Sequence, residues 1–104
     1  MNAIYIDTSD NKKVIVSLKV QGEEDRVEQD IGPQKSQVVL PLIEELLKKH
    51  NLTIRDITHI EVNQGPGSFT GLRVGVSIAN ALSYSLQIPV NNKPVREIVE
   101  PVYE

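Results

Sequence analysis

The sequence contains no cysteine and no tryptophan, and aromatic residues make up only 4% of its 104 positions. Without cysteine the chain has no disulfide, no thiolate metal ligand and no cysteine nucleophile, which is consistent with a reducing compartment. Met1 to Ile4 also lack the charged and apolar regions of a signal peptide. We therefore expect a cytoplasmic protein.

A strong excess of one charge is also missing. Eleven basic side chains stand against fourteen acidic ones, for a formal net charge of −3, and no basic cluster occurs anywhere. A polyanion such as tRNA binds through protein cations that release its counterions. This chain is therefore not expected to bind nucleic acid on its own.

Long hydrophobic runs are absent as well. The longest uncharged segment, residues 74–92, is interrupted repeatedly by Ser, Asn and Gln, whereas a spanning helix needs about 20 predominantly apolar residues. We expect no membrane insertion. The 39% of apolar residues suffices for one core, which predicts a single domain over residues 1–104 with a core at 3–90 and a C-terminal tail at 91–104.

The spacing of apolar residues predicts the element order βββαβαβ. Period-two alternation indicates strands and spacing of three and four indicates helices. A strand that returns to a parallel neighbour across a helix does so right-handedly, so the first, fourth and fifth strands are expected to be parallel. This layout is a ribonuclease H-like α/β fold with a mixed five-stranded sheet. The strands are expected at 3–7, 13–20, 25–31, 57–63 and 88–90, and the two main helices at 36–51 and 68–86.

Within these helices, Ser36 and Ser68 are the expected N-terminal caps; Thr70 is an alternative to Ser68. Pro41 is the awkward residue of the first helix, because it lacks an N–H group and crowds the carbonyl of Gln37. We expect the helix either to bend there or to begin only near Leu40.

Both helices carry more apolar surface than a sheet alone covers. On a helical wheel, the second helix has one apolar arc around Leu72 and an adjoining one containing Val74, Ile78 and Ala81. Either the two helices cover each other, or a partner protein covers them both. The second alternative predicts a helical interface formed by Val39, Ile43, Leu46, Leu47, Leu72, Gly75, Val76, Ala79 and Leu82.

The segment Gly65-Pro66-Gly67-Ser68 joins a strand to a helix and resembles a phosphate cradle, because backbone N–H groups at a helix start attract anions. It lacks the lysine of a P-loop and the glycine spacing of a dinucleotide fingerprint. A tight structural turn is the alternative reading. The first strand ends in Asp7 and Thr8, which either hold a ligand or form a hairpin turn.

No catalytic or metal-binding constellation is apparent in the sequence. Ser68 has no recognisable base and is better explained as a cap. His50 and His59 have no third ligand at metal spacing. We expect no metal site.

Three stretches together resemble one known family. They are Ile4-Tyr5-Ile6-Asp7-Thr8-Ser9, then Ser36-Gln37 with Leu40-Pro41-Leu42-Ile43, and then Gly65-Pro66-Gly67-Ser68-Phe69-Thr70-Gly71-Leu72-Arg73-Val74-Gly75. They are similar to TsaB, the non-catalytic subunit of bacterial tRNA threonylcarbamoyladenosine synthesis. The similarity extends over residues 3–90, and the third stretch is its most specific part.

The resemblance implies an actin-like, ribonuclease H-type fold and a role as platform for the catalytic relative TsaD, with the ATPase TsaE as a further partner. In that family the two helices pack against those of TsaD or of a second copy. The chain is therefore expected to dimerise when alone and to meet tRNA only through the complex. The metal-binding histidines of TsaD are not matched, since Lys35, Gln37 and Val39 occupy that stretch, so no metal or cofactor is expected.

The sequence departs from the family in lacking the second actin-like domain. Glu100-Pro101-Val102-Tyr103 resembles the family's C-terminal Pro-x-Tyr ending, so we expect a naturally shortened protein without an interdomain cleft. Asp7, Thr8, Gly65, Gly67 and Ser68 are then vestiges of a phosphate loop.

The leading hypothesis is a non-catalytic assembly subunit that docks on a TsaD-like enzyme. One alternative is a small nucleotide-binding or phosphotransfer protein of the actin-like ATPase superfamily, which would use Asp7 and the glycine loop. The other alternative is a stand-alone regulatory homodimer. It predicts the same helical face as the leading hypothesis and differs only in the identity of the partner.

Overall fold

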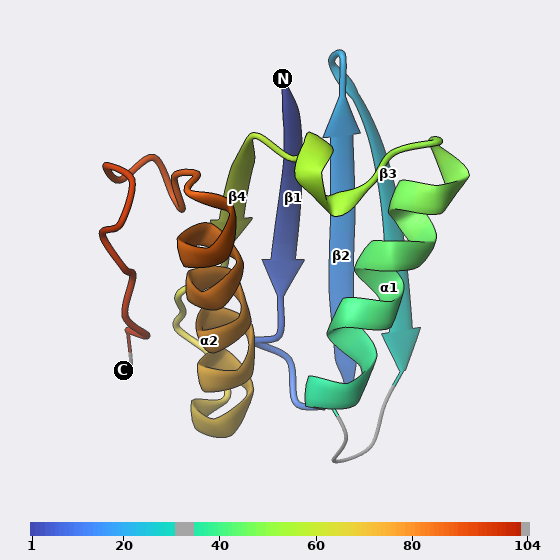
Figure 1. Cartoon of the computed structure of the whole chain (residues 1–104). Helices are drawn as coiled ribbons and strands as arrows, with labels where there is room; N and C mark the ends of the chain where they lie inside the picture. The colour runs from blue at the N-terminus through green and yellow to red at the C-terminus, as the bar shows by residue number, and fades with distance from the viewer. Residues whose placement is uncertain (31–34, 103–104) are drawn as a thin grey trace.

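The computed structural model describes residues 1–30 and 35–102; the side chains of residues 35, 36 and 69 are not part of the description. The described chain contains a four-stranded sheet and two long helices (Figure 1). The elements are β1 (Asn2–Asp7), β2 (Lys13–Val20), β3 (Glu23–Asp30), α1 (Lys35–Lys49), the short 3₁₀ helix η1 (Ile54–Asp56), β4 (His59–Val62) and α2 (Phe69–Leu86).

The strands lie in the order β3-β2-β1-β4. The first three strands form the predicted antiparallel meander, and β4 pairs with β1 in parallel after the crossover through α1. In this register Ile4 lies beside both Leu18 and Ile60. Because paired residues point to the same face of a sheet, the apolar residues of three strands gather on one side.

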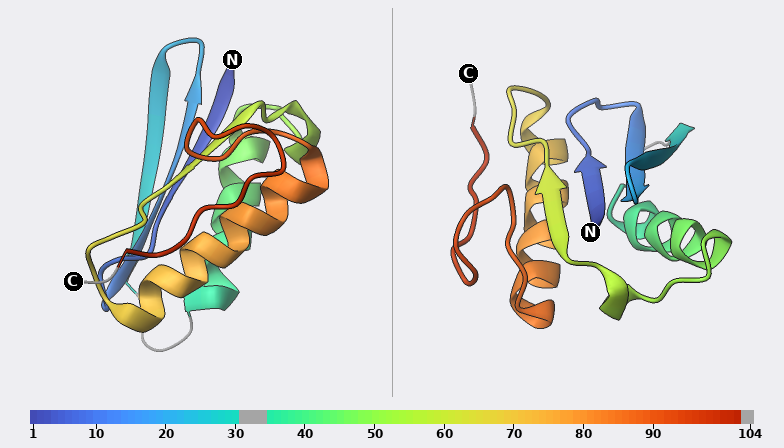
Figure 2. Two further views of the ribbon diagram at one scale, coloured as in Figure 1. Left: turned by 90° about the vertical axis from the view of Figure 1, so that its left-hand side faces the viewer. Right: turned by 90° about the horizontal axis from the view of Figure 1, so that it is seen from above.

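Both helices cover that one face, and the opposite face carries no helix (Figure 2). Helix α1 packs on β2, while α2 packs on β4 and β1. The core between sheet and helices is closely packed. Its largest fully buried side chains include Ile4, Ile6, Leu18, Ile43, Leu46, Ile60 and Leu72.

Helix α1 corrects one expectation. It begins at Lys35, one residue before the predicted cap Ser36, and continues through Pro41 rather than starting at Leu40. Pro41 is exposed, so its ring stands on the solvent side of the helix. A proline there removes one backbone hydrogen bond, and burial of the helix's apolar face compensates for that loss.

Helix α2 begins as predicted. The Ser68 hydroxyl accepts a hydrogen bond from the Gly71 amide at 3.3 Å, which caps the helix. The helix ends at Leu86, and the capping residue Gln87 adopts a left-handed conformation with φ of 58°. Among the described residues, neither long helix has the length and hydrophobicity needed to cross a bilayer.

The predicted fifth strand is reduced to a single parallel bridge between Ile60 and Val90. Pro89 has no amide to donate to a ladder, and the chain turns away at Asn91 and Asn92, both with positive φ. The sheet of the described chain therefore has four strands rather than five. The following tail lies along the flank formed by α2 and β4 (Figure 2).

Candidate functional site

The candidate ligand site lies where β1 and β4 end and α2 begins. Thr8, the residue after β1, is fully buried. Its hydroxyl donates a hydrogen bond to the Gly71 carbonyl at 2.5 Å and accepts one from the Gly75 amide at 3.0 Å. Thr8 thus joins the first strand to the first turn of α2, and this structural role adds to the two alternatives left open for it, a ligand site or a hairpin turn.

Asp7 organises the turn that follows β1. Its Oδ1 atom accepts hydrogen bonds from the Ser9 amide at 2.9 Å, the Ser9 hydroxyl at 2.6 Å and the Asn63 side chain at 3.2 Å. Partial burial opposes ionisation, but these hydrogen bonds outweigh it and lower the pKa of Asp7. The carboxylate is therefore charged at neutral pH and already engaged within the loop.

The glycine loop is closed against the chain itself. A Cβ atom at Gly67 would lie 2.6 Å from the Ser9 Cβ, so the two loops touch. The Ser68 amide donates to the Ser9 carbonyl at 2.8 Å, and the Gly71 amide is used by the Ser68 cap. A Cβ atom at Gly65 would collide with the Val102 carbonyl of the tail. The structure therefore favours the tight-turn reading of these glycines.

Two of the amides at the start of α2 are not available to a phosphate. A phosphate cradle needs backbone amides that point into open space, whereas the described amides of Ser68 and Gly71 are taken. The negative charge of Asp7 beside the loop opposes a second anion. Asp7, Thr8, Gly65, Gly67 and Ser68 do lie close together, as predicted, but as the joint between sheet and helix.

The histidines lie far from this joint. His50 Nε2 lies 3.0 Å from the Asp25 carboxylate, which also meets Lys49 at 3.1 Å. The hydrogen bonds from His50 and Lys49 lower the pKa of Asp25. The His59 Nδ1 atom lies 2.9 Å from the Thr58 hydroxyl, within hydrogen-bond distance. Within residues 1–30 and 35–102, no three His, Asp or Glu side chains are arranged to hold a metal ion.

The predicted helical interface requires a correction. Seven of its nine residues lie in the core of the chain itself: Val39, Ile43, Leu46, Leu47, Leu72, Val76 and Ala79. Gly75 is buried too, and a Cβ atom there would lie 2.5 Å from the Thr8 hydroxyl. The absence of a side chain at Gly75 therefore lets α2 pack closely against the end of β1, not against a helix of another protein. Leu82 is half-buried against the core. The apolar sides of α1 and α2 that contain these residues face the sheet, and the sheet buries them more fully than the sequence predicted.

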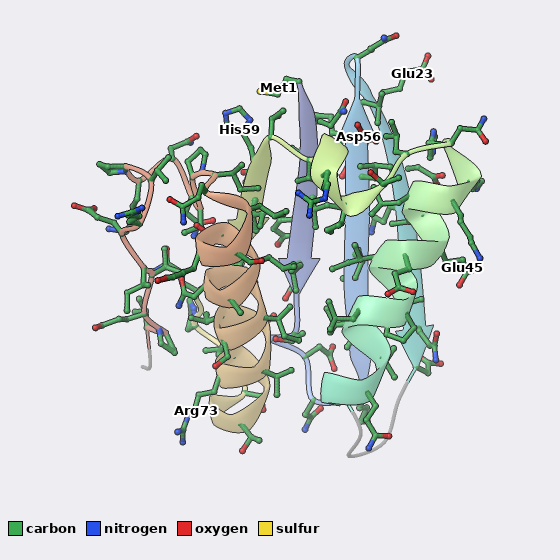
Figure 3. All side chains as sticks on the ribbon, viewed as in Figure 1. Met1, Glu23, Glu45, Asp56, His59 and Arg73 are labelled. Carbon is green, nitrogen blue, oxygen red and sulfur yellow. The ribbon has the colours of Figure 1, made fainter. Side chains whose placement is uncertain are left out.

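Part of the accessible apolar surface lies on the outer face of α2 and is formed by Val74, Ile78 and Ala81; larger exposed fractions are found at Leu40, Tyr84 and in the tail. Val74 and Ile78 are half-buried and Ala81 is exposed. Val74 and Ile78 line a shallow hollow of about 400 Å³, which Arg73 borders. Arg73 projects from the beginning of the helix in Figure 3. The sequence had indicated this surface as the second apolar arc of the helical wheel, which contains Val74, Ile78 and Ala81.

The fold defines the class of protein: an α/β domain whose mixed sheet has the order β3-β2-β1-β4 and carries two helices on one face. The family model for TsaD, described as tRNA N6-adenosine threonylcarbamoyltransferase, matches residues 30–92. The curated relatives, however, include several named TsaB.

The TsaB protein of Buchnera aphidicola (subspecies Schizaphis graminum) is 38% identical over 79 residues, which are 76% of this chain and 33% of the relative. That of Haemophilus influenzae is 31% identical over 86% of this chain and 38% of the relative. The solved structure of YeaZ from Pseudomonas aeruginosa has a TM-score of 0.80 at 28% identity, covering 86% of this chain and 41% of that one.

The chain belongs to the TsaB family, within the wider family that the TsaD model describes. It spans about a third to two fifths of the length of these relatives. The family assignment made from the three sequence stretches is confirmed.

Proposed function

We propose that this chain is a non-catalytic assembly subunit in tRNA threonylcarbamoyladenosine biosynthesis and that it docks on a TsaD-like enzyme. The observation that carries the proposal is the outer face of α2 in a chain of the TsaB family. Helical apolar surface left accessible beside a complete core is typical of a protein interface.

The docking surface is the outer face of α2, and Leu40 of α1 is a second accessible apolar residue. Leu40 is 43% exposed although it belongs to a helix whose other large aliphatic residues are mostly buried. Burying a large aliphatic side chain contributes about 1.5–3 kcal/mol relative to full exposure. Arg73 and Ser77 border the hollow on α2 and supply the polar rim.

We assign the catalytic chemistry to the partner enzyme, and the surroundings of Asp7 support this assignment. Its Oδ1 atom accepts hydrogen bonds from the Ser9 amide and the Asn63 side chain, and the Gly71 amide is used by the Ser68 cap. A catalytic group needs a free acceptor or donor aimed at substrate. tRNA is brought in by the complex, since the chain has a net charge of −3 and no basic cluster.

The test is co-elution of the chain with the TsaD-like enzyme of the same organism. Ile78→Asp places a charge in the middle of the outer face of α2. It should raise the dissociation constant of the complex at least tenfold, which is about 1.4 kcal/mol of binding free energy, and so abolish co-elution at low concentration. Val74→Asp should have the same effect. Val95→Asp is the matched control, because Val95 is 45% exposed on the tail and does not line the hollow on α2.

Circular dichroism must show that each variant stays folded. Co-elution that survives both Ile78→Asp and Val74→Asp in folded chains would overturn the docking surface. Loss of self-association in these variants, with no binding of the TsaD-like enzyme by the parent chain, would instead favour the stand-alone homodimer.

A further inference from the structure

The chain closes most of its sheet with its own residues. At the outer edge of β4, the Asn91 side chain accepts a hydrogen bond from the Val62 amide at 2.8 Å and donates one to the Val62 carbonyl at 3.0 Å. The tail is fixed to α2 by Asn80, whose side chain exchanges two hydrogen bonds of 2.9 Å with the Val99 backbone. Helices α1 and α2 cover one face of the sheet, whereas the other face is open, since no described helix lies over it (Figure 2).

Two small residues stand among long ones at the centre of this open face. In the register of the sheet, Tyr5 lies between Ser17 and Glu61. The neighbouring row contains Ala3 beside Lys19. Paired residues point to the same face of a sheet, so these side chains share the open face. A hollow of about 250 Å³ opens among them, and it is lined by Ala3, Tyr5, Ser17, Lys19, Glu24 and Glu61.

Ser17 carries a polar group without a partner. Its side chain is 2% exposed, and no described residue forms a hydrogen bond with its hydroxyl. Burying a hydroxyl without a hydrogen bond is unfavourable, so such a group is expected to meet a partner. Its register neighbours are Tyr5 and Arg26, and the Arg26 side chain is 53% exposed and free to move aside. A group that enters the hollow can therefore supply the missing bond.

The hollow carries an excess of negative charge. Two of its lining residues, Glu24 and Glu61, are acidic, and one, Lys19, is basic. Within residues 1–30 and 35–102, neither of the two carboxylates forms an ion pair. Lys19 is exposed, so its ammonium group can stay in water. A cation that enters the hollow therefore finds a carboxylate to accept its hydrogen bonds.

Tyr5 supplies an aromatic wall to the hollow. Its hydroxyl donates a hydrogen bond to Asp7 Oδ2 at 3.4 Å. Burial raises the pKa of Tyr5, and the negative charges of Asp7 and Glu61 raise it further, so the ring is neutral at physiological pH. A neutral aromatic ring beside a carboxylate suits a guanidinium group, which stacks on the ring and donates to the carboxylate.

We propose that this hollow binds an arginine side chain presented by a partner protein: the guanidinium group stacks on Tyr5, pairs with Glu61 and donates to the Ser17 hydroxyl. Arginine fits better than lysine, because its planar group has five N–H donors, serves a carboxylate and a hydroxyl at once, and is more weakly hydrated. A metal ion is not the occupant, since no three His, Asp or Glu side chains of the described chain are arranged to hold one. The site lies on the face of the sheet opposite α2, so it is independent of docking on that helix.

The test is a titration of the isotope-labelled chain with N-acetyl-L-arginine amide at constant ionic strength, followed by NMR. The amide signals of Tyr5, Ser17 and Lys19 should move along one saturating curve. N-acetyl-L-citrulline amide has nearly the same shape without the charge, and it should bind about two- to fivefold more weakly because it loses the ion pair.

Single variants assign the contacts. Glu61→Gln should weaken binding of the arginine probe about two- to fivefold, and Lys19→Gln should strengthen it by removing a competing cation. Ser17→Ala should weaken binding yet leave the free chain at least as stable in urea, since its hydroxyl has no hydrogen bond to lose. The matched control is Glu45→Gln, which removes an exposed carboxylate on α1 (Figure 3) and should leave binding as in the parent chain.

Signals that do not saturate, or equal binding of the arginine and citrulline probes, would overturn the proposal and leave the hollow to water. The same holds if Glu61→Gln and Ser17→Ala both bind the arginine probe like the parent chain, or if Glu45→Gln weakens binding as much as Glu61→Gln does. A marked loss of stability in Ser17→Ala would also contradict it, because the hydroxyl would then already be bonded within the chain.

Discussion

The two faces of the sheet are buried by different means. On the helix-covered face, Ile4, Ile6 and Val16 are at most 1% exposed beneath α1 and α2. On the open face, Ile15 is still only 9% exposed although no helix lies over it. Glu28 lies opposite Ile15 on β3 and forms ion pairs with Arg26 at 2.8 Å and Lys13 at 3.7 Å.

Long charged side chains therefore shield the open face, with their aliphatic stems over the sheet and their charged ends in water. The helices pack rigidly on one face of the sheet, whereas the charged side chains on the other face remain flexible and solvated. We infer that the helix-covered face provides most of the stability and that the open face mainly keeps the sheet soluble. The predictions below test this difference.

The largest expected effect comes from a matched pair of truncations. Ile6→Ala, on the helix-covered face, should lower the free energy of unfolding by about 2–5 kcal/mol, because helices and strands fixed around the cavity relax only partly. Ile15→Ala, on the open face, should cost clearly less, since flexible side chains and water fill the space. Urea denaturation measures both, and equal losses would contradict the difference between the faces.

Thr8→Val tests the joint between the sheet and α2. The change keeps the shape of the side chain but removes the hydroxyl that serves the Gly71 carbonyl and the Gly75 amide. Leaving buried groups unpaired costs about 1–3 kcal/mol. Thr8→Ser retains the hydroxyl and should recover most of the loss in thermal denaturation; equal loss in both variants would show that packing of the methyl group matters instead.

The lowered pKa of Asp7 predicts a pH dependence. A carboxyl whose folded pKa lies below its unfolded value stabilises the fold above the unfolded pKa, and this contribution is lost as pH falls through the folded pKa. The parent chain should therefore lose more stability between about pH 5 and pH 2 than Asp7→Asn does. Parallel pH slopes of the urea midpoints in the two chains would argue against this role.

The smallest effect is expected on the open face itself. Arg26→Ala removes the exposed ion pair with Glu28, and such pairs contribute about 0–1 kcal/mol. The melting temperature should change little at moderate salt. A large decrease would mean that the charged cover of the open face contributes to stability as strongly as a helix does.

Much of the fold was predictable because it depends on local pattern. A short apolar run predicted β1, alternating residues predicted β2 and β3, and Ser68 marked the start of α2. Right-handed crossover predicted the parallel pairing of β4 with β1. The fifth strand was not realised, because the positive φ angles at Asn91 and Asn92 turn the chain away after one bridge.

The candidate site was harder to predict because burial is a collective property. A helical wheel shows which residues are apolar but not how much of each arc the sheet covers. It therefore assigned Leu72 and Val76 to a partner, whereas the chain's own strands bury them. The roles of Asn80 and Asn91 carried no sequence signal, because each depends on backbone groups brought near by the fold.

The amino-acid sequence by itself determined the order of elements, the apolar side of each one and the family, since these follow from residue spacing and from short motifs within the chain. Only the tertiary structure decided which apolar residues remain accessible, that Thr8 joins β1 to α2, and that Asn91 completes the edge of β4. These features depend on distances between segments far apart in the chain, and such distances arise only when sheet, helices and tail pack together.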